Sequence, residues 1–298
     1  MLILKSKFNA VKSWCTALIP RVKGAARRYL FSQALSLYAA FRYSANVHPH
    51  QLPAKVHSRR YFFKGMFFDF LLAGMIGDAW YGKSNHLTYM EQIARCIHDG
   101  DVVLDLGAHQ GFFTMIYRLL VGAEGAVYAV EPFDHFTDVI RFNASLNKFS
   151  NVYVLNCGLD EEKSIHKITS ISARSAEKAK NQFSNYVISL HLNDFSVLKP
   201  DFVKIDIEGF ELDAFRHAEV FLECKPMFLL SIHPCFIEAR KENYQEIFDC
   251  LQKHDYLFGK VDVKGNFTER TIPSLAHPVS FEVLAIPRSK IPKIKKEA

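Results

Sequence analysis

The first 68 residues contain no Asp or Glu, although the 298-residue chain has 31 acidic residues in all. Twelve Lys and Arg residues lie in this acid-free head, which therefore carries a charge of +12. The remaining 25 basic and 31 acidic residues give the rest of the chain a charge of −6. A basic head of this kind favours contact with an anionic surface.

A long apolar run and a paired-cysteine motif are also absent. No apolar run reaches the roughly 18 residues that a membrane-spanning helix requires. The closest, Met66 to Gly77, is shorter and contains Asp69. The six cysteines form no Cys-x-x-Cys pair, and several lie inside apolar patterns, so we expect reduced thiols in a reducing compartment. The expected location is the cytoplasm, with any contact to a membrane limited to its surface.

Composition divides the chain into three parts. Residues 1–60 are expected to form a basic helical extension, because apolar residues recur in it at helical spacing. Residues 61–287 hold the apolar runs of the main domain, and 288–298 form a basic tail. Three interpretations of the extension remain open: helices packed on the main domain, a helix lying on an anionic membrane surface, and a cleaved targeting peptide. Nucleic acid is not an expected partner.

Two short apolar runs joined by a helix organise the main domain. Val102–Leu106 is apolar and β-branched over most of its length, as expected of a buried parallel strand. Gly107 and Gly111 flank the next turn, a helical pattern follows, and Ala126–Val130 forms a second strand that ends at Glu131. This order is a βαβ unit, in which ligand groups gather at the carboxyl ends of the strands.

The turn and the acid indicate a nucleoside ligand with a positive charge. Glu131 lies 20 positions after Gly111, which suits a strand-end carboxylate that accepts the hydroxyl hydrogens of a ribose. A dinucleotide fold needs glycine at the middle position of the turn, where this chain has His109, and Asp105 adds negative charge where a phosphate would bind. Both features disfavour NAD and favour the sulfonium of S-adenosylmethionine.

Three sequence blocks resemble the signature of a known family. They are Asp-Leu-Gly-Ala-His-Gln-Gly-Phe-Phe at 105–113, Val-Tyr-Ala-Val-Glu-Pro at 127–132 and Val-Lys-Ile-Asp-Ile-Glu-Gly-Phe-Glu at 203–211. In this order they resemble the FkbM-type S-adenosylmethionine-dependent methyltransferases, over about residues 85 to 286. The resemblance implies an α/β Rossmann-like class I methyltransferase fold: a doubly wound, mostly parallel seven-stranded sheet with an antiparallel late strand.

The cofactor implied is S-adenosyl-L-methionine, bound at the ends of the first three strands. In the family pattern, the loop after the third strand, which contains Gly158, lies beside the adenine. The expected cofactor-binding residues are Asp105, Gly107, Ala108, His109, Gly111, Phe112, Glu131, Pro132 and Gly158.

The expected catalytic residues lie at the ends of the next two strands. Asp206 and Glu208 follow the fourth strand and His233 follows the fifth, so in a parallel sheet all three can face one pocket. A hydroxyl is a weak nucleophile and needs a base or a metal. We expect His233 or Asp206 to be the base and Glu208 to position the acceptor.

Two neighbouring residues bear on this assignment. Lys204 lies in the middle of its strand and is expected to be structural, with its amine paired to a nearby carboxylate. The family pattern usually has an acid two positions before the histidine, where this chain has Ser231. That departure weakens both a carboxylate–histidine pair and a metal site, and no metal is expected.

Further elements follow from periodicity and turn signals. Helices are expected over 87–98, 137–147, 208–223 and 242–253, and strands over 151–156, 186–192, 202–206, 227–232, 256–260 and 280–286. Lys264-Gly265-Asn266 is expected to be a hairpin turn. The polar stretch 161–186 gives no clear prediction.

The expected activity is O-methylation of a hydroxyl on a sugar or glycan-like acceptor, an acceptor class that comes from the resemblance alone. Two alternatives remain. Gly77–Ser84 matches the phosphate-loop pattern G-x-x-x-x-G-K-[ST], although Trp80 and Tyr81 are bulky for a loop that wraps an anion. The other alternative is a non-catalytic, membrane-associated binding module that retains the methyltransferase fold.

Overall fold

The structure is a computed structural model, which describes residues 56–73, 90–168, 185–262, 264–272 and 280–294. The expected helices of the basic extension up to residue 55 and the phosphate-loop match at Gly77–Ser84 lie outside the described residues. No helix within the described ranges is both long enough and apolar enough to cross a bilayer.

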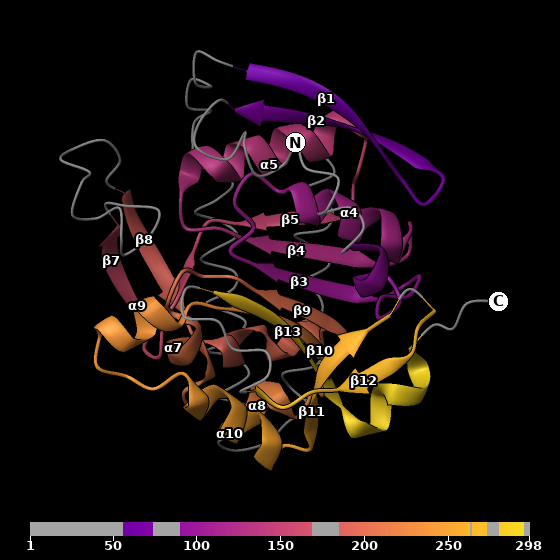
Figure 1. The fold of residues 1–298 in the computed structure, drawn as a ribbon. Helices are drawn as coiled ribbons and strands as arrows, with labels where there is room; N and C mark the ends of the chain where they lie inside the picture. The colour runs from indigo at the N-terminus through magenta and orange to yellow at the C-terminus, as the bar shows by residue number, and fades with distance from the viewer. Residues whose placement is uncertain (1–55, 74–89, 169–184, 263, 273–279, 295–298) are drawn as a thin grey trace, which may run out of the picture.

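The central sheet has the order β12-β11-β13-β10-β9-β3-β4-β5 (Figure 1). β3, β4, β5, β9 and β10 are parallel, while β13 runs antiparallel to β10 and β11. The α/β class and the antiparallel late strand are therefore confirmed, but the sheet has eight strands rather than seven. The strands are β3 (Val102–Leu106), β4 (Ala126–Val130), β5 (Val152–Leu155), β9 (Phe202–Ile205), β10 (Met227–Ile232), β11 (Tyr256–Val261), β12 (Phe267–Glu269) and β13 (Phe281–Pro287).

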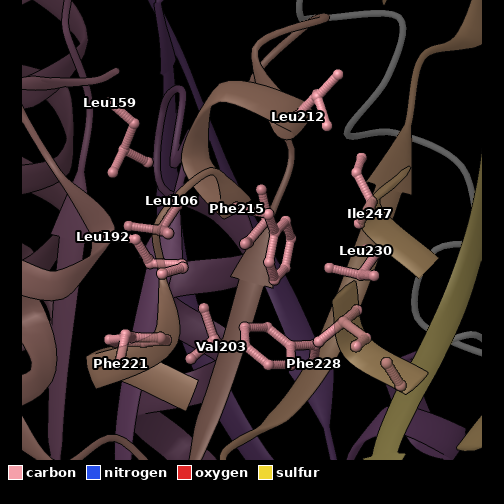
Figure 2. Close-up of a cluster of buried hydrophobic side chains, with 14 of the residues drawn as sticks. Leu106, Leu159, Leu192, Val203, Leu212, Phe215, Phe221, Phe228, Leu230 and Ile247 are labelled. Carbon is pink, nitrogen blue, oxygen red and sulfur yellow. The ribbon is translucent and has the colours of Figure 1, made fainter. Parts of the chain in front are cut away.

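Each face of the sheet builds its own core, because successive strand residues point to opposite faces. Leu104 and Leu106 belong to one buried cluster, and Val103, between them in register, belongs to the other. The first cluster, drawn in Figure 2, packs against α7 (Glu211–Phe215), α8 (Glu219–Leu222) and α10 (Gln245–Lys253). The second packs against α4 (Phe112–Val121) and α5 (Asp134–Leu146). Burial on both faces explains why these strands are apolar over most of their length.

A β-hairpin precedes the main sheet, and the sequence patterns did not predict it. β1 (Val56–Phe63) pairs antiparallel with β2 (Met66–Ala73), and the expected boundary after residue 60 falls inside β1. Lys64 and Gly65, which join the strands, both have positive φ, as a two-residue hairpin turn requires. The hairpin crosses the top of Figure 1, over α5.

Two asparagines on α5 fix the hairpin to the main domain. The Asn143 side chain accepts from the backbone N–H of Leu71 at 2.7 Å and donates to the carbonyl of Leu71 at 3.1 Å. Asn147 makes the same pair of bonds with the backbone of Asp69, at 2.8 and 2.6 Å. The two asparagines are four residues apart on α5, a rise of about 6 Å, and their partners are two residues apart on β2, a rise of about 6.8 Å. The two spacings therefore match.

Three other segments differ from the sequence predictions. The helix expected over 208–223 is split into α7 and α8, because His217 between them has a φ of 57° that a helix cannot include. α9 (Pro234–Ala239) was not predicted. Residues 288–293 of the expected tail form a 3-10 helix, η4 (Arg288–Lys293), after which Ile294 is buried.

A second, smaller sheet includes one strand from the stretch for which no prediction was made, together with the strand that was expected over 186–192. It has the order β6-β8-β7 and is formed by β6 (Gly158–Leu159), β7 (Ser164–Ile168) and β8 (Asn185–Leu190). The 3-10 helix η3 (Leu192–Leu198) then leads back to β9.

Replacing Asn143 by Ala should lower the free energy of unfolding by about 2 to 4 kcal/mol, because it leaves two backbone groups of β2 without their partner. Urea unfolding of the full chain measures this loss. Ser145→Ala, at an exposed position on the same helix, is the control and should change stability by less than about 0.5 kcal/mol. Equal stability of the two variants would show that the hairpin does not depend on the asparagine.

Candidate cofactor and acceptor site

The turn after β3 is held in place by backbone hydrogen bonds to the end of β4. The N–H groups of Gly107 and Ala108 both donate to the carbonyl of Val130 at the end of β4, at 3.0 and 3.1 Å. Gly107 has a φ of 77°, and a Cβ there would lie 1.9 Å from the carbonyl oxygen of Asp206. A Cβ on Gly111 would meet Ile140 of α5 at 2.9 Å. Close packing of the chain on itself therefore requires both glycines.

Glu131 closes this turn from the end of β4. Its carboxylate accepts from the backbone N–H of His109 at 2.8 Å and from that of Phe133 at 3.0 Å. The side chain is only 4% exposed, and burial raises the pKa of Glu131 to about 7, against the opposing effect of these two hydrogen bonds. A carboxylate has about four lone-pair sites, so Glu131 can still accept from the hydroxyls of a ribose.

Asp105 lies beneath the turn and is 0% exposed. Thr114 of α4 donates to its Oδ2 at 2.5 Å, and Lys204 Nζ lies 3.9 Å from its Oδ1. Burial raises the pKa of Asp105, although the charge of Lys204 opposes this effect. Its contact with a cofactor stays a prediction; in this structure its carboxylate supports the floor of the site.

The other residues of the turn divide into two groups. The His109 ring packs on Phe136 with centroids 4.1 Å apart, and burial lowers the pKa of His109 to about 4, so the ring is neutral at physiological pH. Ala108 is buried beside it. Phe112, by contrast, packs edge-on against Tyr61 and Phe70 of the hairpin, so its ring belongs to the core and we no longer expect it to contact the cofactor.

Asn156, at the end of β5, is a site residue that sequence reasoning missed. Its side-chain amide donates to the carbonyls of Glu131 and Pro132, at 3.1 and 2.9 Å. The bonds join the loops after β4 and β5, and Gly158 follows at the start of β6. The predicted residues Glu131, Pro132 and Gly158 thus lie on loops at the same edge of the sheet.

The predicted catalytic residues meet at the ends of β9 and β10. One ligand-type atom each of Asp206, Glu208 and His233 lies within 4.8 Å of the other two. His233 Nε2 is 3.9 Å from Asp206 Oδ1 and 3.9 Å from Glu208 Oε2. The expectation that these strand ends share one pocket is consistent with this arrangement, and we call the three residues the strand-end cluster.

A fourth acid, Glu211, orients the histidine. Glu211 Oε1 lies 2.9 Å from His233 Nδ1, and the carboxylate also accepts from the backbone N–H groups of Ile207 and Gly209. Glu211 thus supplies the carboxylate–histidine pair that Ser231 had put in doubt. The sequence contained the signal, since Glu211 closes the third signature block.

The charges of this cluster set the protonation of its members. Burial alone would lower the pKa of His233, but Glu211, Asp206 and Glu208 outweigh it and raise that pKa to about 9. Burial raises the pKa of Glu208 to about 7. Burial would raise the pKa of Asp206 too, but the charges of Lys204 and His233 lower it. An imidazole that already carries a proton cannot act as a base, which argues against His233 in that role.

Lys204 has the structural role that was predicted. Its amine lies 3.0 Å from Asp206 Oδ2 and 3.9 Å from Asp105 Oδ1, and its side chain is almost fully buried. The charges of the two carboxylates hold the pKa of Lys204 above its usual value, although burial opposes this effect.

Comparison with known proteins identifies the family. The model of the "Methyltransferase FkbM domain" matches residues 105–258, just over half of the chain. The chain belongs to the FkbM methyltransferase family. This FkbM protein is accordingly an S-adenosylmethionine-dependent methyltransferase, and S-adenosylmethionine is its cofactor. A search of curated proteins gave no significant match.

Solved structures similar to this FkbM protein include three methyltransferase-fold proteins. Precorrin-6y C5,15-methyltransferase from Geobacter metallireducens is 13% identical with a TM-score of 0.39, covering 71% of this chain and 97% of that one. An S-adenosylmethionine-dependent methyltransferase from Aquifex aeolicus is 16% identical with a TM-score of 0.41, covering 70% and 96%. Aeropyrum pernix fibrillarin with bound S-adenosylmethionine is 15% identical with a TM-score of 0.42, covering 80% and 86%.

The residues at this edge of the sheet fit the cofactor chemically. Glu131 offers acceptor capacity for ribose hydroxyls, as a carboxylate at the end of the second strand should. Asp105 and Asp206 make the surroundings acidic, and Asp105 Oδ1 is a buried oxygen without a hydrogen-bond partner. Such an environment suits a cationic sulfonium and disfavours a phosphate.

Replacing Glu131 by Gln should weaken binding of S-adenosylmethionine by at least about tenfold, because a neutral amide accepts less strongly than a carboxylate. Isothermal titration calorimetry measures the affinity, and thermal unfolding shows whether the variant is folded. Glu269→Gln, on the exposed β12, is the control and should bind as the wild type does. Unchanged affinity in folded Glu131→Gln would exclude this carboxylate from the cofactor site.

Proposed function

We propose that this FkbM protein transfers a methyl group from S-adenosylmethionine to a hydroxyl group of a sugar or glycan-like acceptor. The observation that carries the proposal is the common location of two groups of residues. Glu131 and the turn after β3 lie at the carboxyl ends of the parallel strands, as does the strand-end cluster. β4, β3, β9 and β10 are consecutive in the sheet, so donor and acceptor can meet across its centre.

In this proposal the turn after β3 holds the donor. The cofactor supplies an electrophilic methyl group on a positively charged sulfur. Glu131 accepts from the ribose hydroxyls and, through its bond to the His109 N–H, keeps the turn in place. The buried carboxylate of Asp105 contributes negative charge under the turn. These residues bind and orient the donor so that the reacting carbon faces the ends of β9 and β10.

The strand-end cluster receives the acceptor. Its carboxylates can accept hydrogen bonds from neighbouring hydroxyls of a sugar, which aligns one oxygen with the methyl carbon. That oxygen loses its proton and forms the new C–O bond while the C–S bond breaks, and the sulfur leaves as a neutral thioether. In this proposal Asp206, beside Glu208, is the group that accepts the departing proton. The choice of a sugar acceptor rests on the family resemblance and on these hydroxyl-binding groups.

Incubation of the full chain with methyl-labelled S-adenosylmethionine and a glycan-containing cell extract tests this function. The expected product is a methyl ether, which withstands mild base and appears on a monosaccharide after acid hydrolysis. Glu131→Gln is the negative control and should give little label. A base-labile methyl ester or label on protein nitrogen would contradict the acceptor class. Absence of label from every fraction, with cofactor binding intact, would favour a non-catalytic binding module.

We further propose that the β1–β2 hairpin places the enzyme on an anionic membrane surface. Phe62 and Phe67 are paired across the strands at its tip, 55% and 65% exposed, with rings 4.9 Å apart. Exposed Arg59 and Lys64 flank them. Aromatic rings beside basic groups suit the interface of an anionic bilayer, where the rings enter the headgroup region and the charges meet phosphates.

The double variant Phe62→Ser/Phe67→Ser should bind vesicles that contain phosphatidylserine about tenfold more weakly than the wild type, because the inserted rings are lost. Vesicle sedimentation of the full chain measures the partition. Tyr186→Ser removes an equally exposed ring from β8 and should bind as the wild type does. The hairpin has no such role if both variants sediment alike.

A further inference from the structure

In the strand-end cluster, three atoms that could ligate a metal face one another without forming hydrogen bonds to one another. His233 Nε2 is 3.9 Å from one oxygen of Asp206 and equally far from one oxygen of Glu208. An N–H donor would approach a carboxylate oxygen to 2.7–3.2 Å, so these separations are too long for hydrogen bonds. Two ligands that share a divalent ion at about 2.0–2.2 Å lie about 3 to 3.6 Å apart at tetrahedral or octahedral angles. The three ligand atoms lie within 4.8 Å of one another, with His233 Nε2 at 3.9 Å from each oxygen, so they would close in around an ion by about 1 Å or less.

The orientation of His233 points its Nε2 at the space between Asp206 and Glu208. Nδ1 contacts Glu211 Oε1 at 2.9 Å, which fixes the ring, and His233 is nine-tenths buried. A histidine that ligates a metal almost always donates its other ring N–H to a carboxylate or carbonyl in this way. The same Glu211 carboxylate accepts from the backbone N–H groups on either side of Glu208, those of Ile207 and Gly209, so it positions the histidine and the loop together.

The backbone of the loop keeps both acids on the same side. Glu208 has a φ of 56°, which is rare for a residue with a side chain, and Gly209 follows with a φ of 103°. A Cβ on Gly209 would lie 2.5 Å from Phe236 of α9, so a residue with a side chain does not fit there. Backbone held in such a conformation is characteristic of functional sites.

The local charge also calls for a cation. Asp105, Asp206, Glu208 and Glu211 are four carboxylates, and Lys204 is the amine that pairs with two of them. In the ion-free protein a proton on His233 offsets part of the remaining negative charge. A cation bound between the three atoms would take the place of the proton on Nε2, since metal binding releases protons from its ligands.

We propose that Asp206, Glu208 and His233 bind one divalent transition-metal ion, such as Mn²⁺ or Zn²⁺, with Glu211 as the positioning residue. One imidazole nitrogen and two carboxylate oxygens suit these ions better than Ca²⁺, which takes six to eight oxygen ligands. Three protein ligands leave coordination positions open for the acceptor. This site deepens the proposed function, on which its chemical role rests.

At those open positions the ion would act as a Lewis acid on the acceptor hydroxyl. Coordination lowers the pKa of a hydroxyl, so its proton leaves to water before the oxygen takes up the methyl group. The ion would also fix the oxygen in line with the C–S bond. Sequence reasoning expected no metal, because Ser231 replaces the usual acid, but Glu211 provides the orienting carboxylate from another element.

The test measures Mn²⁺ and Zn²⁺ binding to the full chain after chelator treatment, by calorimetry and, for Mn²⁺, by electron paramagnetic resonance. We expect a site that binds about one ion per chain in the wild type and is at least about tenfold weaker in both Glu208→Gln and His233→Ala. Glu211→Gln should weaken it less than loss of a ligand does. Glu238→Gln, at an exposed position on α9, is the control and should leave affinity unchanged.

Absence of a site in the wild type, or equal affinity in the folded ligand variants, would overturn the metal site. Neither result bears on the proposed function, because the measurement uses no cofactor and no turnover. Methyl transfer that persists in chelator-treated enzyme would overturn the metal's role and leave methylation intact. Thermal unfolding and S-adenosylmethionine binding show that each variant is folded. If Glu208→Gln is the only ligand variant that is folded, its affinity for Mn²⁺ and Zn²⁺ decides whether the metal site exists.

Discussion

The buried amine of Lys204 joins the two halves of the site. It lies between Asp105, beneath the cofactor turn, and Asp206, in the strand-end cluster, at 3.9 and 3.0 Å. Burying these charges without partners would cost several kcal/mol each, so their positions depend on one another. Gly107 contributes a second link, since its lack of a side chain lets the turn touch the backbone of Asp206. The turn after β3 and the strand-end cluster are therefore parts of one rigid strand edge.

Sequence patterns correctly predicted those parts of this edge that depend on residues close together in the chain. The apolar runs of β3 and β4, the helix between them and the acid at Glu131 predicted the βαβ unit and the edge where its ligand groups gather. They could not reveal the packing around the glycines. Gly107 and Gly111 were predicted to bind the cofactor, and the structure adds that Asp206 and Ile140, distant in sequence, lie so close that neither position has space for a side chain. Such close approaches depend on tertiary packing.

The same limit explains what was missed around the acceptor cluster. The partner of His233 is Glu211, 22 positions away, and only the parallel pairing of β9 with β10 brings the two together. The β1–β2 hairpin was missed because its Phe-rich strands pack on the domain on one side and are exposed on the other, while Asn143 and Asn147 of α5 satisfy its backbone. No local pattern records that contact, although the turn at Lys64-Gly65 was a visible signal.

The central claim is that the turn after β3 and the strand-end cluster bind donor and acceptor side by side. A crystal structure of the full chain with the product S-adenosylhomocysteine tests it most directly. We expect ribose hydroxyls within about 3.2 Å of Glu131 and the sulfur facing Asp206 and His233. A ligand bound elsewhere, or one whose sulfur points away from the ends of β9 and β10, would contradict it.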